Sequence, residues 1–560
     1  MTATPQWDIV IAGAGPTGLT LANFLGMLGV RTLVLEQLPR LIDYPRGVGM
    51  DDETLRTFQA LGLAAQVRSH TVPGQVMRFL DAKRRLIAAI NPQAQPFGWP
   101  RRSGFIQPLV DAELFAGLRR FPNVQLEFQH AVAGFAEDGD GIAITVNAVD
   151  ADGQATGDAH VVRARYLVGC DGGRSPVRTA LGVGFPGKSE STRWLVIDVG
   201  DDPVGTPNVS LVLDKEFPYV EIALPHGVRR FEFMVPAGTD DAAFDDRARV
   251  RALLGRVLPQ PGQVRLIRHR VYTHHARIAP TFRQGRVFLA GDAAHLMPVW
   301  QGQGFNTGIR DATNLAWKLA LVVQGRAGDA LLDSYTRERH PHAAAMIDLS
   351  VLVGRIFVPA HAALRLLRDL VAPWLSRIPS LRQFIAEMRF KPMPFFREGA
   401  VVHDPSHPAP SPVGRMFIQP RVRTRDGGVA LLDDVLGPRF AIVSWSARAD
   451  AWITPAARTV LRALGAVSVV VRPECQDLGR ELPQDGFAVS DAEGSLRAWF
   501  DAAPGSVIVL RPDRAIAAVC NPQTLSATLE RLAQVLSLQP VPPAAQAEAA
   551  APGIQQELAA

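Results

Sequence analysis

The sequence predicts an α/β fold with a parallel sheet and more than one domain. Residues 8–36 read as strand, glycine-rich turn, helix and strand, because the apolar run at 8–12 leads into Gly13-x-Gly15-x-x-Gly18 and then into helical apolar spacing. Residues 283–345 return to the order strand, glycine-rich turn and long helix. A βαβ unit implies parallel strands with a right-handed crossover. A chain of 560 residues suggests about three domains.

The composition is that of a globular protein, with 47% hydrophobic and 20% charged residues and a net charge of +5. No basic block resembles a nucleic-acid-binding arm, and no apolar run reaches the ~20 residues of a membrane span. We therefore expect neither nucleic acid nor membrane as a partner. No signal-peptide pattern is visible, and Cys170, Cys475 and Cys520 form no CxxC pair. We expect a cytoplasmic protein with no disulfide framework and no metal site.

Changes in pattern divide the chain into segments. We expect a discontinuous nucleotide-binding domain at 1–75, 101–184 and 276–355. Residues 76–100 and 185–275 alternate apolar and polar residues, which favours an inserted antiparallel β-rich domain. Residues 356–400 would form a helical connection. A proline-rich segment then opens a small α/β domain at 401–540, and the Ala/Pro-rich residues 541–560 are predicted to be a disordered tail.

The three glycines of the first turn have separate physical roles. Gly13 permits the tight turn, Gly15 lets the backbone approach a pyrophosphate, and Gly18 allows close packing of helix on strand. The helix N-terminus offers free N–H groups to the phosphates. Glu36 ends the next strand, where a carboxylate can accept from ribose hydroxyls. The alternative is a glycine corner needed only for packing, and this turn alone does not distinguish NAD from FAD.

Two further strand ends carry acidic residues. The strand 287–290 is followed by Gly291-Asp292, a glycine-rich turn at 301–304 and a helix, while "YLVGCDGGRSPVR" places Asp171 after another strand. Asp292 can accept from a ribityl or ribose hydroxyl, and the helix N-terminus near Asn306 can face a polarised ring carbonyl. Two binding segments far apart in the sequence, the first glycine turn and the segment after Gly291, suit a long, extended dinucleotide. For Asp171 the alternative is an ordinary strand-to-helix turn.

In this order, GAGPTG, CDGGRSPVR and AGDAAHLMPVWQGQGFNTGIRDA resemble the class A FAD-dependent aromatic hydroxylases, the para-hydroxybenzoate hydroxylase superfamily. More narrowly, "LIDYPRGVGMDDETLRTFQALGL", "FGWPRRSGFIQP" and "RVYTHHARIA" resemble 3-(3-hydroxyphenyl)propionate hydroxylases. The resemblance covers residues 8 to about 350 and extends to about 520. It implies a Rossmann-like FAD-binding domain, an inserted antiparallel β substrate domain and a thioredoxin-like C-terminal domain.

The resemblance also implies roles for individual residues. Glu36 would hold the adenosine ribose, Arg46 would contact FAD and help recruit the nicotinamide, and Asp171 would serve both nucleotides. Asp292 would bind the ribityl region, and Gln107 would lie near the flavin. The full set implied for the cofactor is Gly13, Gly15, Pro16, Gly18, Glu36, Arg46, Gln107, Asp171, Asp292, Pro298, Gly304, Phe305 and Asn306.

The implied reaction uses bound FAD, NADH or NADPH as a transient co-substrate (NADH is expected), and O₂. A flavin C4a-hydroperoxide would transfer its distal OH to the ortho position of a phenol, most closely 3-(3-hydroxyphenyl)propionate, to give 3-(2,3-dihydroxyphenyl)propionate for aromatic catabolism. No second glycine motif is present for the nicotinamide. By analogy, a homodimer is compatible with the sequence. The C-terminal domain lacks CxxC, which favours a structural or oligomerisation role.

A phenol becomes more nucleophilic as it loses its proton, so a base or acceptor is expected beside its hydroxyl. The catalytic candidates are Asp51, Asp52, His226, Tyr272, His274 and, as an aromatic wall, Trp300; Arg229 and Arg230 are candidates for a substrate carboxylate. Each has an alternative reading. Asp51 or Asp52 would be a helix N-cap, Tyr272 and His274 interdomain contacts, and Trp300 a core residue. Arg229 and Arg230 point to opposite faces of a strand, and either is alternatively a solvated surface residue.

Other functions remain open from the sequence. The same fold serves hydroxylases of other phenols or polyketides, which would have a broad apolar pocket without a carboxylate partner. A plain NAD-dependent dehydrogenase would explain the first glycine turn but leave the GDAAH segment unexplained. A non-catalytic FAD-binding sensor would keep the cofactor and lack turnover.

Overall fold

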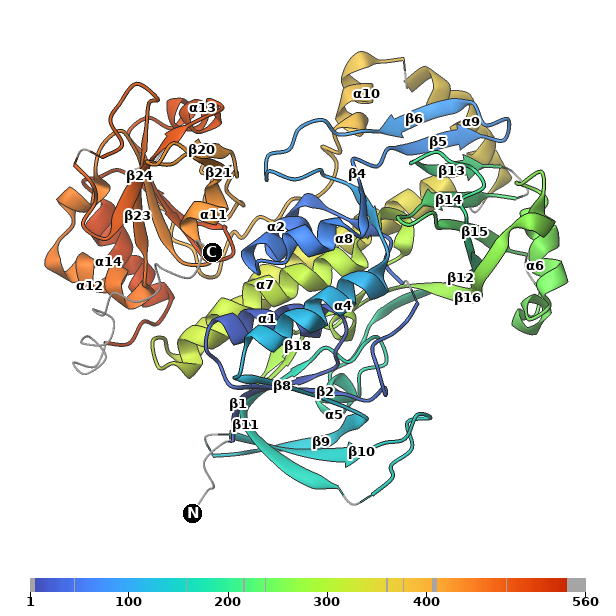
Figure 1. Cartoon of the computed structure of the whole chain (residues 1–560), viewed down its shortest axis with the longest axis horizontal. Helices are drawn as coiled ribbons and strands as arrows, with labels where there is room; N and C mark the ends of the chain where they lie inside the picture. The colour runs from blue at the N-terminus through green and yellow to red at the C-terminus, as the bar shows by residue number, and fades with distance from the viewer. Residues whose placement is uncertain are drawn as a thin grey trace. The chain divides into compact units, whose positions relative to one another are not determined.

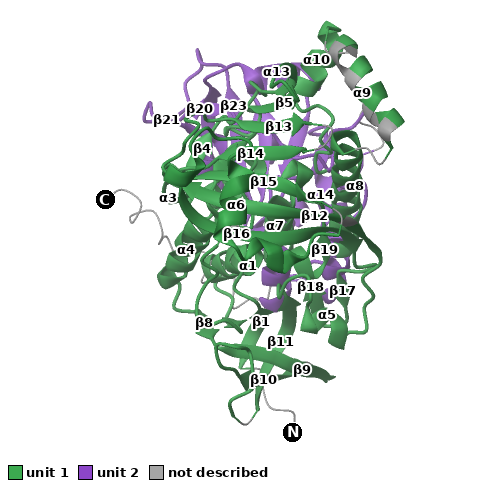
Figure 2. Ribbon diagram, turned by 90° about the vertical axis from the view of Figure 1, so that its right-hand side faces the viewer, with its two compact units in different colours: residues 1–316, 336–394 green, residues 317–335, 395–560 purple. Residues whose placement is uncertain are grey.

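The computed structural model describes residues 6–44, 46–139, 141–157, 159–214, 217–236, 238–358, 361–375, 377–404, 410–479 and 481–540. They form two compact units: residues 1–316 with 336–394, and residues 317–335 with 395–560 (Figure 2). The division falls inside one helix, α7 (Gly304–Val323). The tail predicted at 541–560 lies outside the described residues.

The first sheet of unit 1 carries the predicted βαβ unit. Its strands follow the order β17-β18-β11-β1-β2-β8, and β10 and β9 extend it from β11. Pairing is parallel from β18 through β11, β1 and β2 to β8, and antiparallel at β9, β10 and β17. The strands are β1 (Trp7–Ala12), β2 (Thr32–Glu36), β8 (Val124–Phe128), β9 (His130–Asp138), β10 (Gly141–Ala148), β11 (His160–Gly169), β17 (Arg283–Gln284) and β18 (Val287–Leu289).

Helix α1 (Pro16–Met27) follows β1 where the sequence predicts it. Its first residue is proline, whose missing N–H costs nothing there. Gly29, with φ of +73°, takes the left-handed conformation just past the helix end. Helix α1 packs beside α4 (Gln107–Gly117) above the sheet (Figure 1). Shorter helices of this region are α2 (Asp52–Ala60), α3 (Ala64–Arg68) and α5 (Pro176–Ala180).

The second sheet of unit 1 has the order β19-β16-β12-β15-β14-β13-β5-β6. It is antiparallel except where β5 pairs with β13 in parallel, so the expectation of an antiparallel arrangement for residues 76–100 is wrong at that junction. The strands are β5 (Met77–Asp81), β6 (Leu86–Ile90), β12 (Gly187–Gly200), β13 (Val209–Leu213), β14 (Tyr219–Ala223), β15 (Arg229–Val235), β16 (Arg265–Ile278) and β19 (His295–Leu296); α6 (Arg247–Leu254) lies between β15 and β16 in sequence.

Three short strands and three helices complete unit 1. The small antiparallel sheet β3-β7-β4 joins β3 (Gly49–Met50), β7 (Ser103–Phe105) and β4 (Thr71–Pro73). The helices α8 (Ser334–Phe357), α9 (Ala362–Leu375) and α10 (Pro379–Ala386) follow α7. Phe357 and Met388 pack in one core with Trp194, Trp300 and the apolar residues of β13 and β14. This helical segment therefore covers part of the second sheet.

Unit 2 contains a seven-stranded sheet of order β21-β20-β24-β23-β22-β25-β26. Strands β22, β23 and β24 are parallel, whereas β25 and β26 run antiparallel to their neighbours. The strands are β20 (Arg421–Arg423), β21 (Val429–Leu431), β22 (Ala441–Trp445), β23 (Val467–Arg472), β24 (Gly486–Asp491), β25 (Val507–Leu510) and β26 (Ile516–Cys520); the helices are α11 (Leu432–Leu436), α12 (Pro455–Leu464), α13 (Ser495–Ala502) and α14 (Leu525–Val535).

A buried ion network joins three distant segments of unit 1. Asp51 caps α2 by accepting from the Thr54 N–H at 3.1 Å, and its carboxylate also pairs with Arg310 of α7. Lys391 Nζ lies 2.9 Å from Asp51 Oδ2 and 3.0 Å from Glu53 Oε1. Burial acts to raise the pKa of Asp51, but Arg310 and Lys391 outweigh it and hold that pKa below its usual value.

We expect Lys391→Met to destabilise the fold by about 3–5 kcal/mol, because it leaves two buried carboxylates with one counter-charge. The free energy of unfolding from urea titration measures this. Arg265→Gln is the control, since Arg265 pairs with Asp201 at an exposed site and should change stability little. Equal, small effects of the two substitutions would contradict a structural role for the network.

Candidate active site

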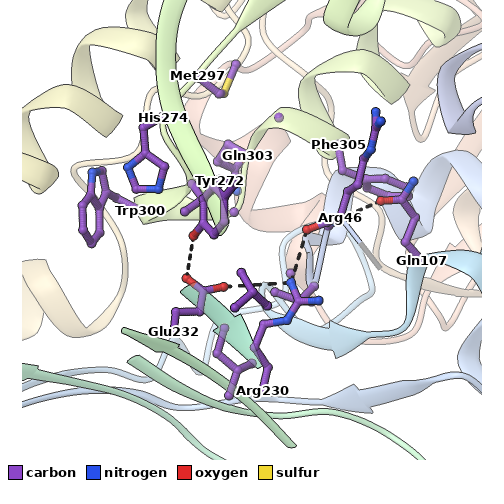
Figure 3. Close-up of a pocket in the computed structure, with 18 of the residues that line it drawn as sticks. Arg46, Gln107, Arg230, Glu232, Tyr272, His274, Met297, Trp300, Gln303 and Phe305 are labelled. Atoms are coloured by element: carbon purple, nitrogen blue, oxygen red, sulfur yellow. Dashed lines mark hydrogen bonds and ion pairs between the residues drawn. The ribbon is translucent and has the colours of Figure 1, made fainter. Parts of the chain in front are cut away.

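A cavity of about 700 Å³ lies in unit 1, and residues of both the β1–α1 turn and the second sheet line it. Figure 3 shows the part around Tyr272. In this view Trp300 and His274 lie on one side of Tyr272, and Arg46, Phe305 and Gln107 lie on the other. Apolar side chains of the second sheet complete the wall; they include Met77, Val196, Val209, Leu211, Val220 and Ile222.

The glycine turn forms one end of the cavity. A Cβ at Gly13 or Gly18 would collide with backbone, against the Cys170 carbonyl or the Gly13 carbonyl respectively. A Cβ at Gly15 would meet no atom within 4 Å, and Gly15 lines the cavity. No side chain caps the N-terminus of α1. Open space in front of free helix N–H groups is the cradle that a pyrophosphate requires, so these residues fit the adenosine-diphosphate part of FAD.

The three predicted carboxylates occupy different positions around this end. Glu36 is buried and accepts from the Ala14 N–H at 2.7 Å and the Leu38 N–H at 2.9 Å. Asp171 accepts from the Val177 N–H at 3.0 Å, and its Oδ1 is a buried atom without a partner among the described residues. Asp292 lines the cavity, and burial raises its pKa. Asp292 therefore offers acceptor capacity to hydroxyl groups of a nucleotide in the cavity, whereas Glu36 and Asp171 are not among the lining residues.

The loop that carries Arg46 is fixed by Gln107. Gln107 Oε1 accepts from the Gly47 N–H at 2.7 Å, and its Nε2 donates to Asp111 at 3.1 Å. Burial raises the pKa of Asp111 to about 7. The Phe105 and Phe305 rings pack with centroids 4.7 Å apart behind this loop. Arg46 and Gln107 thus face the cavity from a constrained wall.

The turn before α7 forms a further part of the cavity wall. Met297, Gly304 and Phe305 line the cavity, whereas Pro298 and Asn306 are absent from its lining. The Asn306 side chain is buried and donates to the carbonyls of Gly49 (3.0 Å) and Gly302 (2.8 Å). Asn306 therefore joins the two loops that flank the cavity.

On one face of β16, a row of four side chains lines the cavity, and these side chains differ in burial. Arg268, Arg270, Tyr272 and His274 are two residues apart, so they point to the same side of the strand, and all line the cavity. Arg270 is exposed, Arg268 and Tyr272 are half-buried, and His274 is buried. Arg268 lies 3.7 Å above the Tyr44 ring. The row passes from cationic side chains at the solvent side to a buried imidazole.

Tyr272 belongs to a buried polar network with two acids. The Tyr272 hydroxyl donates to Glu232 Oε2 at 3.0 Å, and Arg230 pairs with Asp198 at 2.8 and 3.0 Å and with Glu232 at 3.9 Å (Figure 3). Burial raises the pKa of Glu232, and burial together with Glu232 raises that of Tyr272. The positive charge of Arg230 is therefore already paired with the carboxylates of Asp198 and Glu232.

His274 lies in an aromatic corner of the cavity. Its Nδ1 is 3.2 Å from Glu190 Oε2, and its Nε2 has no partner among the described residues. The His274 and Trp300 ring centroids are 5.0 Å apart, and Trp194 packs against both rings. If Nδ1–H donates to the carboxylate, Nε2 carries a lone pair that no donor among the described residues satisfies.

Four candidates lie outside the cavity lining. Asp51 and Asp52 are buried at the start of α2, which agrees with the N-cap alternative for Asp51; burial raises the pKa of Asp52 to about 6. His226 contacts His70 at 3.2 Å on the surface, and Arg229 pairs with Asp202. None of these four residues is among those that line the cavity, so none is assigned a role toward a ligand. The solvated alternative for Arg229 and Arg230 is wrong, because both side chains are buried against carboxylates.

Sequence reasoning missed Glu232 and Glu190. Glu232 lies two residues from Arg230 in "RRFEFMV", so a charged pair on one face of an apolar strand was a usable signal. Glu190 reaches His274 because β12 is irregular between Ser189, opposite His275, and Arg193, opposite Thr273. No feature of the sequence indicates that bulge.

Two family models match the chain: an FAD-binding domain at residues 6–350 and an HcaD C-terminal domain at 414–535. A 3-(3-hydroxyphenyl)propionate/3-hydroxycinnamic acid hydroxylase of Mycolicibacterium gilvum is 54% identical over 541 residues, which are 96% of this chain and 93% of that protein. The chain belongs to the class A FAD-dependent aromatic hydroxylases. A hydroxylase of the same name from Escherichia coli is 49% identical over 532 residues, 95% of each chain.

Solved structures agree with the fold. The flavin-dependent monooxygenase PieE, in complex with FAD and substrate, matches with a TM-score of 0.77 at 22% identity, over 95% of this chain and all of that one. A ternary complex of aklavinone-11 hydroxylase with FAD and aklavinone matches with a TM-score of 0.76 at 24% identity, over 95% and 99%. This hydroxylase is an FAD-dependent monooxygenase with an α/β fold.

The described part of the hydroxylase contains neither a candidate membrane span nor a cluster of metal-ligating side chains. None of its helices is both long enough and apolar enough to cross a bilayer. Within the same residues, no three His, Cys, Asp or Glu side chains group as metal ligands.

Gly15→Ala and Gly18→Ala should separate cofactor binding from folding. We expect Gly15→Ala to raise the Kd for FAD at least about tenfold, because its methyl group enters the cradle, while the unfolding midpoint of the apoprotein stays unchanged. Gly18→Ala should lower that midpoint with or without FAD, since its Cβ meets the Gly13 carbonyl. Flavin-fluorescence titration and thermal unfolding measure both. Unchanged FAD affinity in Gly15→Ala would place the pyrophosphate elsewhere.

Proposed function

We propose that this hydroxylase converts 3-(3-hydroxyphenyl)propionate to 3-(2,3-dihydroxyphenyl)propionate, consuming NADH, a proton and O₂ and releasing NAD⁺ and water. The names of relatives at 49–54% identity support the substrate. The observation that carries the chemistry is a cavity in which apolar side chains surround a buried imidazole with an unpartnered Nε2. Such a site can bind a phenol and accept its proton.

The cofactor residues divide into two groups. Gly15, Pro16 and the N-terminus of α1 would hold the pyrophosphate, with Gly13 and Gly18 shaping the turn; Glu36, Asp171 and Asp292 would hold hydroxyl groups. Arg46, Gln107, Gly304 and Phe305 would line the ring. When bound, FAD takes a hydride from the nicotinamide and activates O₂ for transfer to the aromatic ring. The protein residues supply binding, orientation and exclusion of water.

We assign the phenol hydroxyl to His274. His274 lines the cavity, its Nε2 is buried and lacks a partner among the described residues, and its Nδ1 contacts Glu190. Acceptance of the phenol proton by Nε2 would raise electron density at the ortho and para carbons, where an electrophilic oxygen attacks. Trp300 would hold the substrate ring from the side.

Tyr272 has a supporting role in this proposal. Its hydroxyl donates to Glu232, which Arg230 in turn faces. Because Arg230 is paired with Asp198, the network carries no free positive charge toward the substrate. We infer that it fixes the wall of the cavity and the orientation of Tyr272.

We further propose that residues 1–75, 101–184 and 276–355 form the FAD domain, that 76–100 and 185–275 form the substrate domain, and that the C-terminal unit is thioredoxin-like. The parallel β22–β24 core with antiparallel strands on both sides supports the last assignment. Cys475 is exposed, whereas Cys520 is buried, and neither forms a disulfide. These positions favour a structural role over dithiol chemistry.

The first test measures turnover. With purified FAD-loaded enzyme, 3-(3-hydroxyphenyl)propionate should stimulate both NADH oxidation and O₂ consumption, and mass spectrometry should find the 2,3-dihydroxy acid. NADPH and larger polycyclic phenols are tested in parallel. Stimulation by polycyclic phenols but not by the acid would replace the proposed substrate, and absence of any turnover would favour an FAD-binding sensor.

The second test addresses the base. We expect His274→Asn to lower kcat by about 10²–10⁴, the usual contribution of a general base. His269→Asn is the matched control, because His269 lies on the same strand outside the cavity lining. Wild-type kcat in His274→Asn, with FAD content unchanged, would remove His274 from the mechanism.

A further inference from the structure

Six arginines line the cavity, and their charges are balanced in different ways. Arg230 is paired with Asp198, as described above. Arg268 and Arg270 contact Tyr44, by ring stacking and by a 3.3 Å hydrogen bond to its hydroxyl. Arg46 also lies over the Tyr44 ring, at 5.9 Å. Arg174 is exposed and so is hydrated.

The remaining one, Arg102, differs from these five. Its side chain is half-buried, its Nε is buried without a partner, and within the described residues its guanidinium makes no hydrogen bond or ion pair. Burial lowers the pKa of Arg102 to about 10, although Asp51 acts in the opposite sense. The Asp51 carboxylate is already engaged by Arg310, Lys391 and the Thr54 N–H. Arg102 is therefore a shielded cation facing the cavity without a counter-ion.

The neighbouring Arg101, in contrast, has hydrogen-bond and ion-pair partners for its guanidinium. Arg101 donates to the Glu387 carbonyl at 2.7 Å and lies 3.8 Å from Asp52. Arg101 does not line the cavity. The backbone at Arg102 is also held, because its carbonyl accepts from the Gln75 N–H at 3.1 Å. The chain thus fixes Arg102 and leaves its guanidinium free for a ligand.

We propose that Arg102 binds the carboxylate of the phenolic acid substrate. The inference rests on the proposed function and names the residue that selects for an acid. A guanidinium presents paired N–H donors that match a carboxylate in a bidentate contact, and shielding from water strengthens that contact. A desolvated cation without a counter-ion is costly, so an anionic ligand gains affinity by pairing with it.

Arg230, the cation expected from the sequence, suits this role less well. It already faces Asp198 and Glu232, so a third carboxylate beside it would meet two acids. The Arg102 carbonyl is bonded to the Gln75 N–H, and Gln75 and Met77, the first residue of β5, line the same cavity. The tail of the substrate would then run along β5 toward the Arg102 segment.

The test compares an acid with its neutral analogue. Arg102→Gln should raise the Kd and KM for 3-(3-hydroxyphenyl)propionate by about 30- to 1000-fold, as expected when a shielded charge pair loses one partner. The Kd and KM for 3-(3-hydroxyphenyl)propanamide should change less than about threefold. Arg102→Lys keeps the charge but not the paired donors, so its effect on the acid should be intermediate. Spectral titration of the FAD-loaded enzyme gives Kd independently of turnover.

A stability measurement separates binding from a structural role. Without substrate, Arg102→Gln should leave the unfolding midpoint unchanged or raise it, because the substitution removes a shielded charge that has no partner. Saturating acid should raise the midpoint of the wild type more than that of Arg102→Gln. These scans remain informative even if the variant has little activity.

The outcomes distinguish the two proposals. If the wild type hydroxylates neither acid nor amide, the proposed function fails. If the wild type hydroxylates the acid but Arg102→Gln weakens acid and amide equally, weakens FAD binding or lowers the unfolding midpoint, the role of Arg102 is overturned. Discrimination between acid and amide that is lost in Arg268→Gln and kept in Arg102→Gln would move the carboxylate site to Arg268.

Discussion

The buried pairing of Asp51 and Glu53 with Arg310 and Lys391 is the interaction on which the site depends. It fixes the start of α2 against α7, and these elements directly follow the two loops that flank the cavity. Asn306 reinforces the same junction by bonding Gly49 and Gly302. Charges buried at this depth specify one arrangement, because any alternative would leave a carboxylate or a cation unpaired.

The local parts of the site were predictable from the sequence. Gly13, Gly15 and Gly18, followed by α1, have a spacing that backbone geometry dictates within six residues. Asp171 and Asp292 follow strands that pair side by side, so the sequence places them at one edge of the sheet. The alternation of β16 likewise puts Tyr272 and His274 on one face.

The long-range parts were not predictable. Asp51 pairs with Lys391, which is 340 residues away in the sequence. No local sequence pattern connects the two residues. The contact of Glu190 with His274 depends on an irregularity of β12. Arg229 and Arg230 read as surface residues because charge usually indicates exposure, whereas nearby acids make their burial tolerable here.

The two-residue spacing of Arg268, Arg270, Tyr272 and His274 limits which sequence changes can alter the substrate range of such an enzyme. A strand repeats every two residues, so inserting or deleting one residue between 268 and 274 would exchange the cavity face for the opposite one. Substitution at an even-numbered position changes one contact and leaves the other three in place. Strand β12 carries extra residues opposite His274, and the row on β16 keeps its register beside them. We expect new substrate ranges on this scaffold to arise from point changes along β16.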